Sequence, residues 1–117
     1  MNFRIVSDSS CDLGRERCQE LDVELVSFYA ALGDETYYRE ERDISTGEFY
    51  RRMAAMPGVF PKTSMPTVED YLQAFSSAAR QAVPILCICL TSRFSGSYQT
   101  ARNAAEKLRE ELPQARV

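Results

Sequence analysis

An apolar run at residues 83–90 constrains the fold more than any other feature, because a polar turn and a helix follow it at once. The run has the length of a strand and is rich in Ile, Leu and Cys, which predicts a central strand buried on both faces of a parallel sheet. The turn at residues 91–97 places hydroxyl groups and Gly96 where the carboxyl edge of the sheet meets the free N–H groups of a helix N-terminus. An α/β fold often binds an anionic group at such a place.

Segments typical of strands and helices alternate along the rest of the chain. Strands are expected at residues 3–8 and 23–29, joined by a short helix at about residues 13–21 that Asp12 caps. Because the connection is a helix, the two strands should be parallel and the crossover right-handed. Longer helices are expected at about residues 46–55, 68–82 and 98–112. We therefore predict one α/β domain over residues 1–117, with a mostly parallel sheet and helices on both of its faces.

Capping signals mark the two middle helices. Ser45 and Glu48 match a capping box, in which the serine hydroxyl accepts from the glutamate N–H and the glutamate carboxylate accepts from the serine N–H. Thr67 and Asp70 have the same spacing. Residues 56–67 contain three prolines, which predicts an extended loop of restricted shape between these helices.

Two shorter segments carry weaker expectations. Residues 33–39 should form a turn with a short β extension. Pro113 ends the last helix, and residues 115–117 resemble the first step of a further strand. The chain is therefore interpreted as part of a longer protein.

Composition excludes several classes of function. The formal net charge is −3 and the 14 basic residues are spread along the chain, so no nucleic-acid partner is expected. The apolar run is too short to cross a bilayer, and the first residues lack the pattern of a signal peptide. These features predict a cytoplasmic protein without a transmembrane segment.

Four cysteines in such a chain are expected to be free thiols. Cys87 and Cys89 should lie on one face of a strand, where small buried hydrophobic side chains explain them best. Cys11 lies near a loop of potential function, although packing again explains it better. The chain has no CxxC motif and no histidine, so neither a zinc site nor any other metal or cofactor is expected.

Known catalytic motifs are missing as well. Ser95 and Gly96 follow a strand, as in a nucleophile elbow, but Arg93 breaks the G-x-S-x-G pattern and no histidine can serve as base. Neither a P-loop nor a GxGxxG motif is found. Neutral donors remain in three loops: Ser9, Ser10, Thr63, Ser64, Ser95, Ser97 and the Gly96 amide. If these loops meet at one carboxyl-end crevice, they can hold a carboxylate or phosphate, which predicts binding more than catalysis. For Thr63 and Ser64, simple turn chemistry is the alternative.

Three segments resemble the sequence signatures of the DegV family of bacterial fatty-acid-binding proteins. They are residues 8–13 (DSSCDL), 61–66 (PKTSMP) and 94–101 (FSGSYQTA), in the same order and at similar spacing. Departures are small: Ser97 stands where threonine is usual, Phe94 where leucine is common, and Gly14 where proline often occurs. The resemblance implies a two-domain α/β protein that holds a long-chain fatty acid with its tail in an apolar tunnel and its carboxylate hydrogen-bonded by hydroxyls.

Carried over to this sequence, the resemblance implies that Thr63 and Ser95 bind the carboxylate. The secondary positions at this site are Ser64, Gly96, Ser97, Asp8 and Ser9. The family's second domain, which adds an arginine and a histidine, is not expected within these residues. In some members a partner kinase phosphorylates the bound acid with ATP, so the chain would be a lipid carrier and not itself an enzyme.

Two other interpretations stay open. One is a small phosphoryl- or acyl-transfer domain that uses Ser95 as nucleophile. The other is an interaction-only chain that self-associates through exposed apolar residues, among them Met53, Met56 and Phe60.

Overall fold

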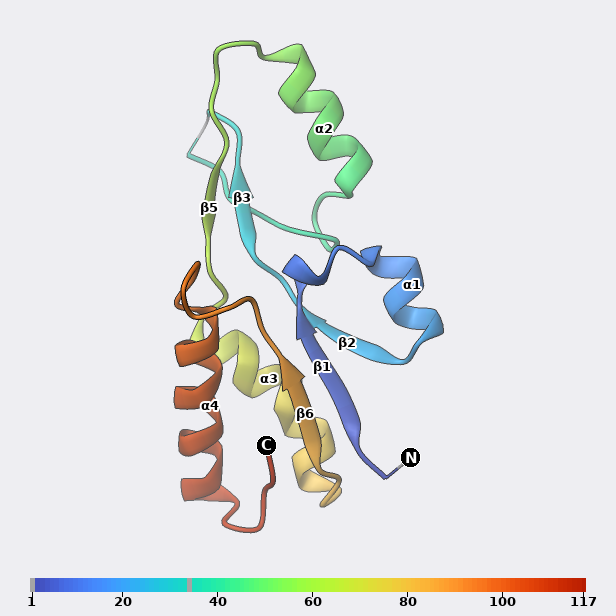
Figure 1. Cartoon of the computed structure of the whole chain (residues 1–117), viewed down its shortest axis with the longest axis vertical. Coiled ribbons are helices and arrows are strands. Elements are labelled where there is room, and N and C mark those ends of the chain that lie inside the picture. Colours follow the sequence, from blue (N-terminus) through green and yellow to red (C-terminus); the bar gives the residue numbers. More distant parts are fainter. Residues whose placement is uncertain (1, 34) are drawn as a thin grey trace.

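The computed structural model describes residues 2–33 and 35–117 and measures 50 × 27 × 23 Å along its principal axes. In this part of the chain, a parallel sheet with strand order β2-β1-β6 adjoins an antiparallel sheet with strand order β4-β3-β5 (Figure 1). The strands are β1 (Arg4–Asp8), β2 (Val23–Val26), β3 (Tyr29–Ala31), β4 (Tyr38–Arg39), β5 (Lys62–Ser64) and β6 (Ile85–Ile88). The helices are α1 (Gly14–Glu20), α2 (Thr46–Ala55), α3 (Val68–Arg80) and α4 (Ser97–Glu111), with a 3₁₀ turn at Ser9–Cys11. The predicted α/β class, a parallel sheet flanked by helices, is confirmed.

β1 is the central strand of the parallel sheet, and β2 and β6 both run parallel to it. Val6 pairs in register with Glu24 of β2 and with Cys87 of β6. The expected parallel arrangement of the first two strands is therefore confirmed. The carboxyl ends of β1 and β6 lie at the same edge of the sheet, and a polar turn follows each of these strands.

β6 is an edge strand among the described residues, which corrects the prediction that the apolar run is central and buried on both faces. Ile85 is 7% exposed, whereas Leu86 and Ile88 are 50% and 51% exposed. Successive residues of a strand point to opposite faces, so one row is covered and the other is not. Among the described residues the second face stays half exposed, because an apolar strand does not itself specify which elements cover it.

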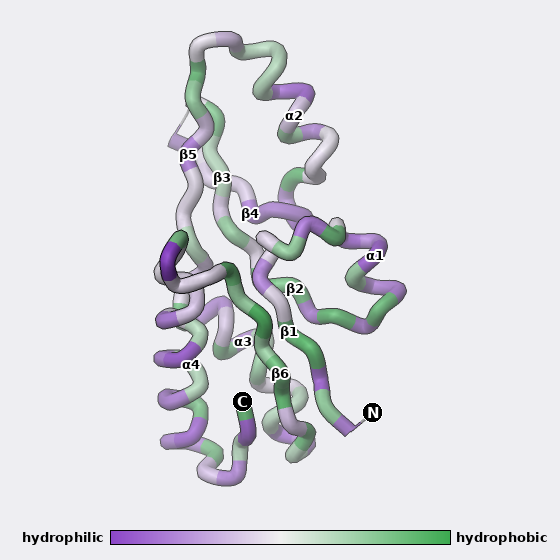
Figure 2. The backbone as a smooth tube through the Cα atoms, in the orientation of Figure 1, coloured by the Kyte–Doolittle hydropathy of each residue, from purple (hydrophilic) through white to green (hydrophobic). Residues whose placement is uncertain are grey.

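The main core lies between the parallel sheet and helices α3 and α4. Tyr71 and Phe75 of α3 are fully buried, and their ring centroids are 5.8 Å apart. Small residues of α4, among them Ala101 and Ala104, are buried opposite them and allow close helix packing. Burying each large side chain stabilises the fold by roughly 1.5–3 kcal/mol. Figure 1 shows α3 and α4 side by side and α1 apart from them next to β2, and Figure 2 shows the hydrophobic stretches along β1 and β6.

The second sheet was only partly expected. The predicted strand at residues 23–29 ends at Val26, and the chain then leaves the parallel sheet to form β3. β5 lies in the segment predicted to be an extended loop, and it pairs antiparallel with β3, Ala30 opposite Thr63. Prolines favour the extended backbone that a short strand also needs, but the partner strand is about thirty residues away and no local pattern indicates it.

The caps of the middle helices follow the sequence. Thr67 and Asp70 form the complete capping box of α3, with Asp70 N–H to Thr67 Oγ1 at 3.1 Å and Thr67 N–H to Asp70 Oδ2 at 2.9 Å. At α2, the Ser45 hydroxyl accepts from the Glu48 N–H at 3.2 Å. The Glu48 carboxylate does not accept from the Ser45 N–H. It pairs instead with arginines in the next turn of α2.

The expected cap of α1 is wrong. Asp12 adopts a left-handed backbone conformation with φ 57° and precedes Leu13, which has no side-chain capping bond. Instead, the N–H of Arg15 donates to the Glu41 carboxylate at 3.1 Å. A carboxylate from a distant loop thus satisfies the first turn of α1, which no local motif could indicate.

After α4 the chain turns back toward the sheet. Residues 115–117 form no strand, but the N–H of Ile85 donates to the Arg116 carbonyl at 2.8 Å, so the segment begins to follow the free edge of β6. Across the described residues, no helix combines the length and the apolar character that a membrane span requires.

Candidate functional site

Asp8 organises the site at the carboxyl edge of the parallel sheet. It is the last residue of β1 and is 1% exposed. Its carboxylate accepts from the N–H of Leu90 at 2.8 Å and from the hydroxyl of Ser97 at 3.0 Å. These bonds join the first signature segment to the turn between β6 and α4, across more than eighty residues of sequence.

Tyr71 extends this buried network from helix α3. Its hydroxyl lies 2.5 Å from Ser97 Oγ and 3.6 Å from Cys89 Sγ. Because Ser97 gives its only hydroxyl proton to Asp8, the tyrosine donates to Ser97. Burial raises the pKa of Tyr71, so its hydroxyl keeps this proton. A continuous chain of donors, Tyr71 to Ser97 to Asp8, therefore fixes the start of α4.

Gly96 allows signature segment 61–66 to pack closely against signature segment 94–101. A Cβ built at Gly96 would lie 2.8 Å from the sulfur of Met65 and 3.3 Å from its terminal methyl. The hydroxyl of Thr100 is 3.8 Å from the same sulfur. Met65 thus packs on the first turn of α4, which brings the end of β5, with Ser64 next to Met65, to this edge of the site. A side chain at position 96 would displace Met65.

The hydroxyls predicted to bind a ligand are exposed or half-buried. Thr63 and Ser64 are exposed on β5, and Ser95 is half-buried just before α4. Ser95 Oγ accepts from the N–H of Ser97 at 3.1 Å, so its own proton is available to donate to an anion. Gly96 is exposed beside it.

Ser9 has a different environment from the other predicted residues. It is 8% exposed, donates to the Glu40 carboxylate at 2.7 Å and accepts from the N–H of Phe28 at 2.9 Å. Both capacities of its hydroxyl are therefore engaged toward residues 27–40, not toward Ser95. The neighbouring Ser10 donates to Asp8.

Large exposed apolar side chains lie next to Ser95 in the chain or against Gly96. Phe94 is 83% exposed, Tyr98 is 45% exposed and Met65 is 44% exposed. From Tyr98, a groove of about 330 Å³ runs between β6 and α4 toward Arg109. Tyr71 is not among the site residues expected from the sequence. A buried tyrosine in an apolar stripe needs a partner for its hydroxyl, which was the available signal for its second role.

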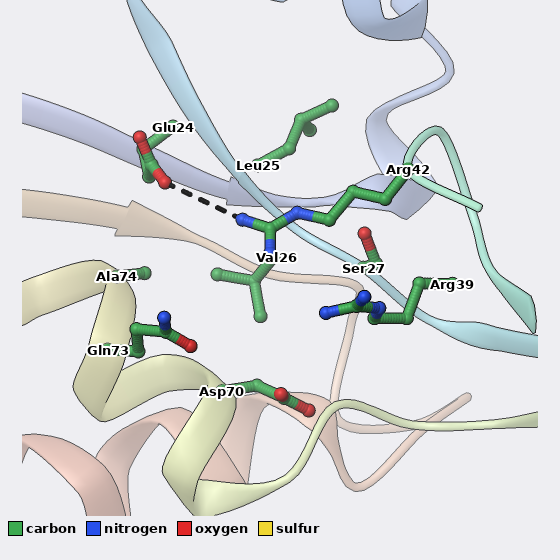
Figure 3. A pocket seen from close by; sticks show the side chains of 9 residues that line it. All are labelled: Glu24, Leu25, Val26, Ser27, Arg39, Arg42, Asp70, Gln73 and Ala74. Carbon is green, nitrogen blue, oxygen red and sulfur yellow. Dashed lines mark ion pairs between the residues drawn. The ribbon is translucent and has the colours of Figure 1, made fainter.

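A separate polar cavity of about 240 Å³ is lined by α3, by the end of β2, by Arg39 of β4 and by Arg42 in the turn after β4 (Figure 3). Arg42 lies 4.0 Å from the Glu24 carboxylate. Tyr29 donates to Asp70 at 2.9 Å. The pKa of Tyr29 is raised, mainly because the side chain is buried and secondly because of this hydrogen bond. Two arginines face two carboxylates here, so the cavity lacks the positive excess that would select a carboxylate ligand.

A protein-family model described as "Uncharacterised protein, DegV family" matches residues 2–117. The chain belongs to the DegV family. A DegV domain-containing protein from Clostridium acetobutylicum is 30% identical over 117 residues, which are 100% of this chain and 40% of that protein. Another, from Halalkalibacterium halodurans, is 35% identical over 101 residues, 86% of this chain and 35% of that protein.

Solved structures of DegV proteins share the fold. A protein from Eubacterium ventriosum described as stearic acid-binding has a TM-score of 0.92 and 44% identity, over 97% of this chain and 39% of that one. A DegV family protein from Thermus thermophilus, described by its fatty acid binding, has a TM-score of 0.76 and 29% identity, over 92% of this chain and 38% of that one. The chain thus spans about 40% of the length of the relatives it matches. The resemblance drawn from the three signature segments is confirmed.

Proposed function

We propose that this DegV chain binds a long-chain fatty acid by its carboxylate, with Thr63 and Ser95 as the hydrogen-bond donors. The observation that carries the proposal is the geometry of Ser95, whose oxygen is held by the Ser97 N–H while its proton is available for an anion. The similarity to the stearic acid-binding protein from Eubacterium ventriosum supports the ligand class.

The other predicted residues divide into two groups in this proposal. Ser64 and the Gly96 amide lie beside the two donors and contribute secondary contacts. Asp8, Ser9 and Ser97 are buried and already hydrogen-bonded, so they act by holding the three loops in place. Such rigid support keeps a hydroxyl oriented before the ligand arrives and lowers the entropic cost of binding.

The acyl chain would begin on the apolar surface around Ser95, formed by Phe94, Tyr98 and Met65. Burial of roughly 0.8 kcal/mol per methylene favours a long chain, provided that the chain is well covered. Because the relatives are more than twice as long as this chain, the proposal assigns the remaining cover to a second domain.

In the proposed role the protein is a cytoplasmic carrier and not an enzyme. It presents the bound acid to a partner kinase that forms the acyl phosphate with ATP. Ser95 as a nucleophile finds no support, because the chain contains no histidine to serve as its base.

Substitution of the two donors tests the proposal. Thr63→Ala and Ser95→Ala should each weaken stearate binding by about 1–3 kcal/mol, or roughly 5–150-fold in Kd, through loss of a charge-assisted hydrogen bond. Ser92→Ala, an exposed serine in the same turn, is the matched control and should bind as the unchanged protein does. Calorimetry on the chain, and on any longer protein that contains it, gives the affinities. Equal affinity in all variants would refute the assignment.

Lipid extraction followed by mass spectrometry tests the ligand class independently. A fatty acid should co-purify with the protein and be lost or reduced in the Thr63→Ala, Ser95→Ala double variant. A different lipid class in the extract would overturn the proposed ligand, while a fatty acid retained by the double variant would overturn only the proposed donors.

Self-association is a second candidate property, favoured by the surface around α2. None of the described residues of α2 is buried, and Phe60, in the loop after it, is 85% exposed. Met53 and Met56 are half-buried on the same segment. Sedimentation of the unchanged chain and of Phe60→Ser over a range of concentrations tests it. A monomer at every concentration would eliminate this property.

A further inference from the structure

Two cysteine thiols meet at the carboxyl end of β6. Cys87 and Cys89 lie on the same face, with their sulfur atoms 3.7 Å apart. Both are half-buried, and both line the groove between β6 and α4. Cys89 follows the last residue of β6, so its backbone lies outside the strand pairing that holds Cys87.

The environment of the pair favours one thiolate. A hydrogen bond from Cys87 lowers the pKa of Cys89 to about 7, against the effects of burial and of the Asp8 carboxylate. The same bond raises the pKa of Cys87, which therefore keeps its proton. Arg102, Glu106 and Arg109 of α4 are the charged groups that line the groove. Burial, in contrast, raises the pKa of Cys18 to about 11.

We propose that Cys87 and Cys89 form a reversible disulfide when a hydroperoxide enters this groove, and that they are an oxidation-sensitive site of the protein. The Cys89 thiolate attacks the distal peroxide oxygen, the O–O bond breaks, and the alcohol or water leaves with a proton. The Cys87 sulfur then attacks the resulting sulfenic acid, and its proton departs with the hydroxide as water. Two thiols and one hydroperoxide thus give one disulfide, one alcohol and one water.

The geometry predicts that this disulfide is easily reduced. Its formation requires the sulfur atoms to approach from 3.7 Å to about 2.05 Å, on a backbone that is nearly extended. The loop that it closes is too short to restrict the unfolded chain much, so native strain is not offset by entropy. Strained disulfides have more oxidising potentials and are readily reduced by glutathione.

The pair also contacts the network that supports the proposed ligand site. Cys89 Sγ lies 3.6 Å from the Tyr71 hydroxyl, and the next residue, Leu90, donates its N–H to Asp8. Movement of the Cys89 sulfur toward Cys87 would take it away from the Tyr71 hydroxyl. The oxidation itself does not depend on fatty acid binding, so it can be tested alone.

Peptide mapping of the unchanged chain tests the proposal. The chain is treated with stoichiometric hydrogen peroxide at pH 7.5, denatured, alkylated and cleaved with trypsin. The peptide 81–93 contains Cys87 and Cys89 and no other cysteine, while Cys11 and Cys18 fall in other peptides and act as internal controls. Peptide 81–93 should lose both alkylation sites and two hydrogens, and glutathione should restore them. Double alkylation of this peptide after treatment, or oxidation only at Cys11 and Cys18, would overturn the proposal.

Single variants test the order of attack. In Cys87→Ser, peroxide should leave a sulfenic acid on Cys89 that a cyclic diketone probe labels. In Cys89→Ala, labelling of Cys87 should be at least about tenfold slower, because alanine leaves no hydrogen-bond donor at position 89 to stabilise the Cys87 thiolate. Faster labelling in Cys89→Ala would reverse the assignment of the nucleophile, and circular dichroism of both variants checks that the fold is retained.

Discussion

The buried chain of donors from Tyr71 through Ser97 to Asp8 makes a quantitative prediction about stability. Ser97→Ala removes a hydrogen bond to a carboxylate and leaves the Tyr71 hydroxyl without its acceptor, in a site that is 0% exposed for both residues. A buried bond to a charged group contributes about 1.5–3 kcal/mol, and an orphaned buried hydroxyl adds a further penalty of about 1 kcal/mol or more. We therefore expect Ser97→Ala to lower the free energy of unfolding by about 2–4 kcal/mol.

A double-mutant cycle separates these two contributions. Tyr71→Phe removes one neutral bond and leaves Ser97 with Asp8, so it should lower the free energy of unfolding by about 1 kcal/mol. When both changes are combined, no orphaned tyrosine hydroxyl remains. The double variant should therefore lose about 1 kcal/mol less than the sum of the two single losses.

Urea unfolding followed by circular dichroism measures these free energies. Ser77→Ala, an exposed serine on the helix that carries Tyr71, is the control and should change the free energy by less than about 0.5 kcal/mol. Additivity of the Ser97 and Tyr71 variants within about 0.5 kcal/mol would refute the argument, because it would mean that the two hydroxyls do not depend on each other.

Three further predictions concern the same elements. The pKa of Tyr71 in the folded protein is raised above the unfolded value of 10.0, so the contribution of Tyr71 to stability is fully present below pH 10 and decreases at higher pH. In Tyr71→Phe, the unfolding midpoint should therefore fall less steeply as the pH rises above 10. An unchanged slope in that variant would contradict this. Gly96→Ala should lower the free energy of unfolding by about 1 kcal/mol through contact with Met65, and Met65→Ala in the same chain should relieve that contact, as measured by a thermal melt of both variants. No coupling between these two changes would show that the contact is harmless. Thr67→Ala should lower the free energy of unfolding by about 1 kcal/mol and Ser45→Ala by less, because of these two helices only α3 has the complete capping box. Chemical denaturation measures both losses, and a larger loss in Ser45→Ala would contradict this prediction.

Two serines at the start of α4 have different hydrogen-bond roles. Ser95 and Ser97 are two residues apart, yet Ser97 is buried and donates to Asp8, whereas Ser95 is half-buried and has its proton available. The Ser97 hydroxyl therefore fixes the start of α4, and in the proposed function the Ser95 hydroxyl would face the ligand.

Local patterns in the sequence determined much of this protein. Helices α2, α3 and α4 were predicted from side-chain periodicity and from capping residues, which act over three or four positions along the chain. The parallel pairing of β1 and β2 followed from the helix between them. The three signature segments identified the family without any structure.

The tertiary structure alone decided which elements and hydroxyls become partners. β6 lies at an edge and β5 pairs with β3, although neither strand carries a local sign of its neighbour. Ser97 is buried because Asp8, 89 positions earlier in the chain, ends a strand beside it. The partner of a side chain depends on where distant elements pack, and that depends on the whole set of apolar surfaces that must be buried together, which no single segment encodes.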